Sequence, residues 1–205
     1  MGTLTSGPLS DLARSMAEGF GLRHFVETGT FLGHSSEWAA DVFERVTTVE
    51  SNEDYHAQAR ARLAGRDNVT LIHDDSVLAL QDVVPTLDGP ALFWLDAHAG
   101  GGWFGGADYC PLLGELEAIA QSPFQHVILI DDARAFLAPP PPPYKADCWP
   151  GLSEVILAVN ARFRYDVTCL CDALICTPPS VRPLVVAFSA LVRPAIDSQT
   201  GLPVA

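Results

Sequence analysis

Three carboxylates stand at the ends of two apolar runs, in positions where they could do chemistry together. Asp96 ends the first run in LFWLDAH, and Asp131 with Asp132 ends the second in VILIDDAR. If the runs are neighbouring strands, their tips lie about 5 Å apart, and such charges need a proton or a cation between them. The pattern predicts a divalent-metal site, with Mg²⁺ as the preferred ion. The alternative is that Asp132 caps a turn and points away.

His98 follows Asp96 by two residues. In an extended segment it projects to the same side as Asp96. A neutral imidazole there could remove the proton of a substrate hydroxyl. Asp96 and His98 are therefore the candidate catalytic residues. The alternatives for His98 are an ordinary loop histidine and a further metal ligand.

The stretch HFVETGTFLG predicts a strand that runs into a glycine turn, with a helix over 34–44 after it. A strand, a glycine turn and a helix place backbone N–H groups and a helix dipole at a sheet edge, where α/β proteins bind nucleotides. The glycines form E-x-G-x-x-x-G through Glu27, Gly29 and Gly33, which differs from the G-x-G-x-x-G of nicotinamide enzymes.

Two further acidic residues fit the same nucleotide. Glu50 ends the run RVTTVE about 20 residues beyond Gly29, which places it to accept hydrogen bonds from ribose hydroxyls. Asp75 follows the third run, NVTLIH, and its carboxylate could accept a hydrogen bond from an adenine amino group. The alternative is that the glycines only form a turn and both acids are solvated strand ends.

Strand and helix patterns alternate through five repeats, which predicts an α/β fold with a doubly wound, mostly parallel sheet. Ser76 is the expected cap of the helix over 77–84. Two β-prone runs around Asp172 predict an antiparallel edge hairpin, whereas 178–205 shows no clear period. The expected strands are 24–26, 45–50, 68–73, 91–95, 126–130, 165–171 and 173–177, and the expected helices are 11–19, 34–44, 52–64, 77–84, 111–121 and 152–163.

Composition limits the classes of partner. The 205 residues fit one domain over 1–205, with 48% hydrophobic and 18% charged residues. A formal net charge of −13 repels phosphate backbones and anionic lipids, so a small-molecule substrate is expected, with no nucleic acid and no membrane. Five cysteines without a CxxC pair and the lack of a signal-like N-terminus predict a reduced, cytoplasmic protein.

Taken together, FVETGTFLGHSS, the acidic end of TTVES, HDDS, LFWLDAH and LIDDAR resemble the class I S-adenosylmethionine-dependent methyltransferases, over roughly residues 20–135. The aspartate after the fourth strand and the acidic pair after the fifth resemble the metal-dependent macrocin-type O-methyltransferases. The resemblance implies a Rossmann-like seven-stranded sheet of order 3-2-1-4-5-7-6. Residues 20–135 would form the cofactor- and metal-binding core, and 136–205 the C-terminal strands and substrate-side elements.

The resemblance also implies roles for residues. Glu27 and Gly29 would contact the methionine part of S-adenosylmethionine, Glu50 its ribose, and Asp75 with Ser76 its adenine. His98 would be the base. The implied metal ligands are Asp96, Asp131 and Asp132, and the implied cofactor-binding set is Glu27, Thr28, Gly29, Gly33, Ser35, Glu50, Ser51, Asp74, Asp75, Ser76 and Asp96.

The leading hypothesis is a divalent-metal-assisted O-methyltransferase that acts on a small-molecule hydroxyl, such as that of a sugar or natural product. The competing hypothesis is a non-catalytic nucleotide-binding module that docks a protein partner. It would use the glycine-rich loop 99–108 and the proline run Pro139–Pro143. The loop 99–109, with the aromatic residues Trp103, Phe104 and Tyr109, could instead be a lid over a substrate. Homo-oligomer formation is left open.

Overall fold

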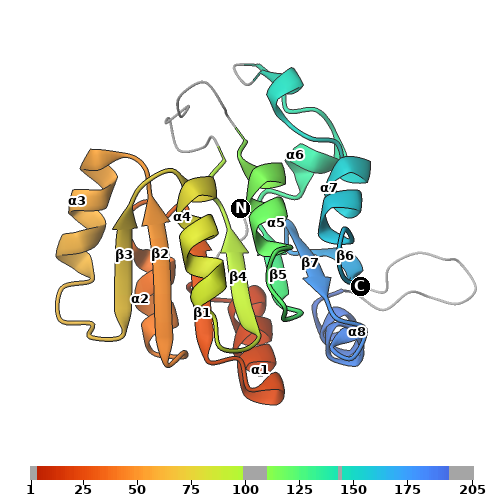
Figure 1. Cartoon of the computed structure of the whole chain (residues 1–205). Helices are drawn as coiled ribbons and strands as arrows, with labels where there is room; N and C mark the ends of the chain where they lie inside the picture. The colour runs from red at the N-terminus through yellow and green to blue at the C-terminus, as the bar shows by residue number, and fades with distance from the viewer. Residues whose placement is uncertain (1–3, 99–109, 143–144, 194–205) are drawn as a thin grey trace, which may run out of the picture.

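The computed structural model describes residues 4–98, 110–142 and 145–193. One seven-stranded sheet has the order β3-β2-β1-β4-β5-β7-β6 (Figure 1). Strands β1 to β5 pair in parallel, and β7 pairs antiparallel with both β5 and β6. The strands are β1 His24–Thr28, β2 Arg45–Glu50, β3 Val69–His73, β4 Ala91–Leu95, β5 Val127–Ile130, β6 Asp166–Leu170 and β7 Ala173–Thr177. The predicted fold class, strand order and edge hairpin are confirmed.

The burial of each strand follows its place in the sheet. Strands β4, β5 and β7 lie inside the sheet and are buried at every position, which explains their nearly unbroken apolar runs. Strands β3 and β6 form the two edges, and their residues are mostly half-buried or exposed. The central strands therefore form the rigid frame from which the site residues project.

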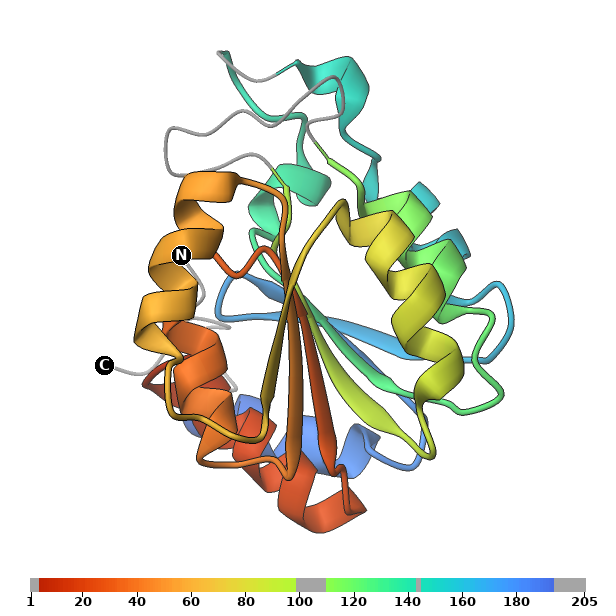
Figure 2. The ribbon, with the colours of Figure 1, turned by 60° about the vertical axis from the view of Figure 1, so that its left-hand side comes forward.

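Helices cover both faces of the sheet (Figure 2). One buried apolar cluster joins α4, α5 and α7 to the sheet, and a second joins α1, α2 and α8 to the opposite face. The longer helices are α1 Pro8–Phe20, α2 His34–Ala40, α3 Glu53–Arg62, α4 Ser76–Val83, α5 Leu112–Ile119, α7 Leu152–Val159 and α8 Arg182–Val192. The short ones are η1 Val84–Thr86, α6 Arg134–Leu137 and η2 Ala146–Cys148. None of the described helices is long and apolar enough to cross a membrane.

Several details differ from the sequence predictions, among them the ends of α2 and α7, which stop four residues before the predicted ends. Asp75, rather than Ser76, caps α4: its Oδ1 accepts hydrogen bonds from the backbone N–H groups of Val77 (2.9 Å) and Leu78 (3.1 Å). Helix α6 was not predicted, since four residues are too few to show a period. Helix α8 was also missed, although it buries Val185 and Phe188.

The tips of β1, β4 and β5 are held in step by backbone hydrogen bonds. The N–H of Asp96 donates to Thr28 O (3.0 Å), and the N–H of Asp131 donates to Leu95 O (3.1 Å). Gly29 lies directly against the next turn: a Cβ added to it would be 2.3 Å from the carbonyl oxygen of Asp96, and its φ is +83°. Glycine is therefore required there on two grounds, and the tips of β1 and β4 stay in contact because of it.

A comparison of two glycines tests this close approach. Gly65 has a similar φ of +87°, but nothing lies within 4 Å of an added Cβ. We expect Gly65→Ala to lower the free energy of unfolding by about 1 kcal/mol, from left-handed strain alone. Gly29→Ala should cost about 3 kcal/mol or more, because the methyl group also collides with backbone. Urea unfolding measures both, and equal losses would contradict the contact between the β1 and β4 tips.

Candidate active site

Glu50 is fixed at the tip of β2 and is only 6% exposed. Its Oε2 accepts a hydrogen bond from the backbone N–H of Phe31 (2.7 Å), and its Oε1 accepts one from that of Asn52 (2.8 Å). Each carboxylate oxygen keeps a further acceptor position. Ser51 is exposed beside it, and its carbonyl oxygen lies 3.2 Å from His73 Nε2. The tip of β2 thus presents an oriented carboxylate at the edge where ribose recognition was predicted.

Phe31 carries the loop from β1 over this carboxylate. It has a φ of +49°, which is unusual for a bulky residue, and the residue is 44% exposed. Its ring packs edge-on against Tyr55 of α3, with 4.5 Å between centroids. The two residues were not among the predicted site residues, because nothing in the sequence relates the loop after β1 to the first turn of α3.

Glu27 lies beneath the start of α2 and is fully buried. Its carboxylate accepts hydrogen bonds from the hydroxyls of Ser35 and Ser36 and, at 2.7 Å, from that of Thr48. Burial raises the pKa of Glu27 to about 7, against the opposing effect of these hydroxyls. Glu27 therefore anchors the first turn of α2, for which Gly33 (φ +80°) is the N-cap. Its predicted contact with the cofactor stays a prediction.

The end of β3 presents two exposed carboxylates, Asp74 and Asp75. Asp75 already caps α4, and Asp74 Oδ1 accepts the N–H of Asp75 (2.7 Å). Ser76 is buried next to them and lies beside Glu115 of α5, a residue that sequence reasoning missed. The signal was present, because a glutamate in the apolar run LLGELEAI needs a buried partner.

Glu115 lies close to two of the predicted cofactor-binding segments. It is 1% exposed, and burial raises the pKa of its carboxyl while the hydroxyls of Ser76 and Thr28 oppose the rise. Thr28, at the end of β1, is fully buried. Neighbouring Gly114 packs against Val77 of α4, where an added Cβ would lie 2.9 Å from a methyl carbon. Helix α5 therefore approaches the α4 N-terminus closely.

The predicted acidic cluster does form at the ends of β4 and β5. His98 Nε2 lies 3.1 Å from Asp132 Oδ2 and 3.7 Å from Asp96 Oδ1. Arg134 Nη2 lies 2.7 Å from the other oxygen, Asp132 Oδ1. Asp131 is 5% exposed, and its buried Oδ1 has no hydrogen-bond partner among the described residues. Asp132 thus does not point away from the others, as the alternative reading required.

Charge neutralisation explains the protonation of this cluster. Burial raises the pKa of Asp96 well above its usual value, and Asp131 and Asp132 raise it further against the effect of His98. Burial also raises the pKa of Asp131 to about 6. Despite burial, His98 and Arg134 lower the pKa of Asp132 to about 2. Burial lowers the pKa of His98, but the surrounding carboxylates outweigh it and the net shift is upward.

Aromatic rings close one side of His98. Its side chain is only 4% exposed, and its ring makes edge contacts with Trp149 (5.2 Å between centroids) and Phe136 (6.0 Å). Those two rings also contact each other at 5.6 Å. Asp96, by contrast, has a side chain that is 37% exposed. The carboxylate of Asp96 is therefore the accessible member of the pair, with the imidazole behind it.

The donor set is chemically suitable for a divalent metal, but its arrangement does not fit one. Both oxygens of Asp132 already face cationic groups, His98 on one side and Arg134 on the other. Among the described residues, no group of three His, Cys, Asp or Glu side chains is placed to hold a metal ion. The metal prediction for Asp96, Asp131 and Asp132 is thus not supported by this geometry, and we derive no step through a metal.

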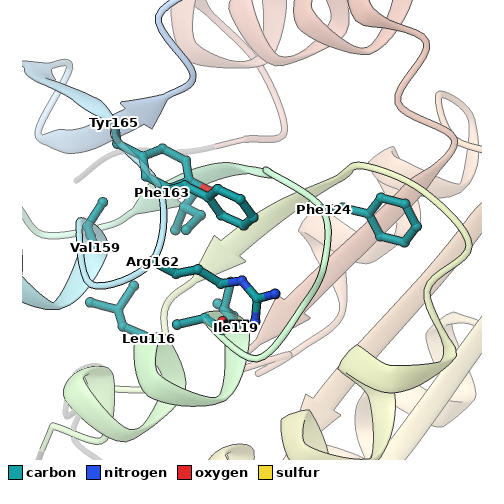
Figure 3. A pocket seen from close by; sticks show the side chains of 9 residues that line it. Leu116, Ile119, Phe124, Val159, Arg162, Phe163 and Tyr165 are labelled. Carbon is teal, nitrogen blue, oxygen red and sulfur yellow. Dashed lines mark hydrogen bonds between the residues drawn. The ribbon is translucent and has the colours of Figure 1, made fainter.

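Two hollows among the described residues lie away from this edge of the sheet. A cavity of about 10 Å³, near the volume of one water, lies between α5, the end of α7 and the segment before β6 (Figure 3). Tyr165 lines it and accepts the N–H of His126 at the start of β5, so the cavity is at the opposite end of the strands. A groove of about 600 Å³ runs between β6 and α8. The predicted lid, 99–109, lies outside the described residues.

Several solved methyltransferases share this fold. An O-methyltransferase from Streptomyces achromogenes that is involved in tomaymycin synthesis, solved with S-adenosylmethionine, matches with a TM-score of 0.57 and 21% identity over 84% of this chain and 81% of its own. An O-methyltransferase from Bacillus cereus in complex with S-adenosylhomocysteine gives 0.54 and 17%, over 83% and 80%. An S-adenosylhomocysteine-bound methyltransferase from Podospora anserina gives 0.58 and 20%, over 83% and 77%. This chain has the methyltransferase fold.

No protein-family model and no curated protein sequence matches the chain significantly. Within the methyltransferase fold, the strand order reverses between β1 and β4, and ligands of open α/β sheets bind at such a switch point. Gly29, Glu50 and Asp96 all stand at this edge. The structure therefore brings the predicted nucleotide-binding turn and the acidic cluster to one place.

The burial of Glu27 has a consequence for the dependence of stability on pH. Its pKa is higher in the folded state (about 7) than in the unfolded chain (4.5), so the folded state holds the proton more tightly. The contribution of Glu27 to the free energy of unfolding should therefore fall as pH rises from 4.5 through 7, by up to about 3 kcal/mol. Glu27→Gln removes this titration, so the free energy of unfolding of the wild type minus that of the variant should decline between pH 5 and pH 8.

Urea unfolding across this pH range makes the measurement. Glu44→Gln is the control, because Glu44 is an exposed partner of Arg23 (2.6 Å) far from the site. A wild-type-minus-variant difference that is flat for Glu27→Gln, or equally steep for Glu44→Gln, would contradict the buried position of Glu27.

Proposed function

We propose that the protein is an S-adenosylmethionine-dependent methyltransferase that transfers a methyl group to a hydroxyl of a small molecule, such as a sugar or natural product. The observation that carries the proposal is the carboxylate of Glu50. It is buried, oriented by two backbone N–H groups, and stands one strand away from the contact between Gly29 and Asp96 at the switch point. Such a residue suits the ribose of a nucleoside cofactor.

The other cofactor contacts follow from the same edge. Glu50 would accept hydrogen bonds from the ribose hydroxyls, and Asp74, Asp75 and Ser51 would hold the adenine. The loop from Gly29 to Gly33 would hold the methionine end. When bound, S-adenosylmethionine supplies a methyl group already activated on a sulfonium, so the protein mainly aligns an acceptor oxygen with it.

Asp96 is the group that takes the proton of the acceptor hydroxyl. Its side chain is accessible, whereas His98 is enclosed and bonded to Asp132. Burial raises the pKa of Asp96 well above its ordinary value, and a carboxylate with a raised pKa accepts a proton more readily than an ordinary aspartate. His98 stands behind it at 3.7 Å as a positive partner. This proposal differs from the sequence prediction, in which His98 was the base and Asp96 a metal ligand.

The acidic character of the chain supports a small acceptor. A net charge of −13 disfavours nucleic acid and anionic membranes as substrates. The cytoplasmic location stays a prediction, as does formation of a homo-oligomer. The competing role is a module that docks a protein partner. An enzyme should bind both S-adenosylmethionine and S-adenosylhomocysteine, whereas such a module need bind neither.

Calorimetric titration with S-adenosylhomocysteine tests the cofactor site. We expect the wild type to bind S-adenosylhomocysteine. Glu50→Gln should raise the dissociation constant by roughly 10- to 100-fold, because charge-assisted hydrogen bonds are lost. Glu53→Gln is the control, since Glu53 is exposed three residues further on. No binding by the wild type would refute the cofactor site, and equal effects of the two variants would refute the role of Glu50.

Conversion of S-adenosylmethionine to S-adenosylhomocysteine, measured with a panel of sugar, catechol and hydroxy-acid acceptors, tests the proton acceptor. We expect Asp96→Asn to lower kcat by about 100-fold or more, while the dissociation constant of S-adenosylhomocysteine changes less than about threefold. Parallel loss of cofactor affinity would contradict the division of roles. Unchanged turnover would exclude Asp96 as the base.

The same assay decides on the metal. Turnover that is indifferent to EDTA agrees with the pairing of Asp132 with His98 and Arg134. Turnover that EDTA abolishes and Mg²⁺ restores would instead support the predicted site at Asp96, Asp131 and Asp132, and would require the Arg134 contact to open.

A further inference from the structure

The tip of the β6–β7 hairpin contacts the segment that follows β5. Asp172 receives two backbone hydrogen bonds from that segment: its carbonyl oxygen accepts the N–H of Ala133 (2.8 Å), and its Oδ1 accepts the N–H of Arg134 (3.2 Å). The Arg134 guanidinium also pairs with the other carboxylate oxygen, Asp172 Oδ2. A residue 38 positions away in the chain thus holds both the backbone and the side chain of Arg134.

Arg134 carries this contact into the acidic cluster. Its Nη2 lies 2.7 Å from Asp132 Oδ1, and Asp132 Oδ2 lies 3.1 Å from His98 Nε2. These contacts form a continuous series from Asp172 through Arg134 and Asp132 to His98. Arg134 contacts both Asp172 and Asp132, and Asp132 contacts both Arg134 and His98. A movement of Asp172 therefore affects the position of His98.

The backbone at both ends of this contact is unusual. Asp132 has a φ of +53°, and Cys171 and Asp172 have φ values of +54° and +61°. The hairpin turn contains only Cys171 and Asp172, because Leu170 pairs with Ala173. Such turns favour glycine or asparagine, and strained residues persist where the surroundings hold them. The strained residue Asp132 and the strained turn at Cys171 and Asp172 belong to the two segments that meet in this contact, so the contact is what holds both.

We propose that Asp172 is a positioning residue, which fixes Arg134 and through it sets the Asp132 carboxylate that holds the His98 ring behind Asp96. The geometric claim stands on the contacts above. Its importance for methyl transfer rests on the proposed function, in which Asp96 takes the proton and His98 supports it.

A second ion pair in the same hairpin provides a matched control. Asp166, in β6, pairs with Arg182 at 3.3 Å, and the two side chains are 20% and 64% exposed. The values for Asp172 and Arg134 are 23% and 55%. The two pairs are alike in chemistry and exposure, but the Asp166 pair has no link to His98. Asp166→Asn therefore shows what the loss of an ion pair does to the hairpin alone.

Nuclear magnetic resonance of the imidazole nitrogens gives a readout that needs no substrate. The His98 signals are assigned by their loss in His98→Gln, and the exchange rate of the Nε2 proton is measured at fixed pH. We expect Asp172→Asn to increase this rate by about threefold or more, because the hydrogen bond to Asp132 opens more often. Asp166→Asn should leave it unchanged. An equal effect of both variants, or none from Asp172→Asn, overturns the proposal.

Arg134→Gln removes the residue that joins Asp172 to Asp132. It also serves as the test variant if Asp172→Asn does not fold. If Asp172 acts through Arg134, the His98 Nε2 proton should exchange no faster in the double variant Asp172→Asn with Arg134→Gln than in Arg134→Gln alone. Additive effects would overturn the proposal. A titration with S-adenosylhomocysteine on the same samples keeps the two claims apart. Absent binding with the expected exchange rates would refute the proposed function and leave the positioning role of Asp172 intact.

Discussion

The arrangement of the site depends on the contact between the tips of β1 and β4. Gly29 lies so close to the carbonyl group of Asp96 that no other residue fits without moving one of the strands. The backbone bond from Asp96 N–H to Thr28 O then fixes the register. Because the strand order reverses at this point, the same contact brings a nucleotide-binding turn and a carboxylate to one edge.

The second constraint is the cost of gathering carboxylates in a partly buried place. The protein meets it in two ways. Glu27 and Glu115 are surrounded by hydroxyl groups and have raised pKa values. Asp132 instead remains charged between two cationic groups. The first kind of site holds loops in place, and the second kind holds the His98 ring next to Asp96. Asp96 differs from these residues because its side chain is accessible and its pKa is raised, which is why we propose it as the group that takes the proton of the acceptor.

Sequence reasoning predicted what periodicity and strand ends determine. The apolar runs before Asp96 and Asp131 became neighbouring strands, and the acidic residue Glu50 stands at the tip of β2 as expected. Contacts between distant segments were not predictable, because they depend on how side chains pack. Asp172 was placed in a turn, but nothing in the sequence shows that this turn reaches Arg134. The same limit explains why the Glu50 carboxylate could be placed but the residues that orient it could not.

Hydrogen–deuterium exchange with and without S-adenosylhomocysteine tests the central claim, that the cofactor binds at the switch point between β1 and β4. When S-adenosylhomocysteine is bound, we expect slower exchange in two segments, the loop 29–33 and the start of α4 at 75–78. The groove between β6 and α8, lined by Thr168, Val185 and Ser189 among others, should not change. Protection of that groove, with no change at the β1 and β3 ends, would contradict the account.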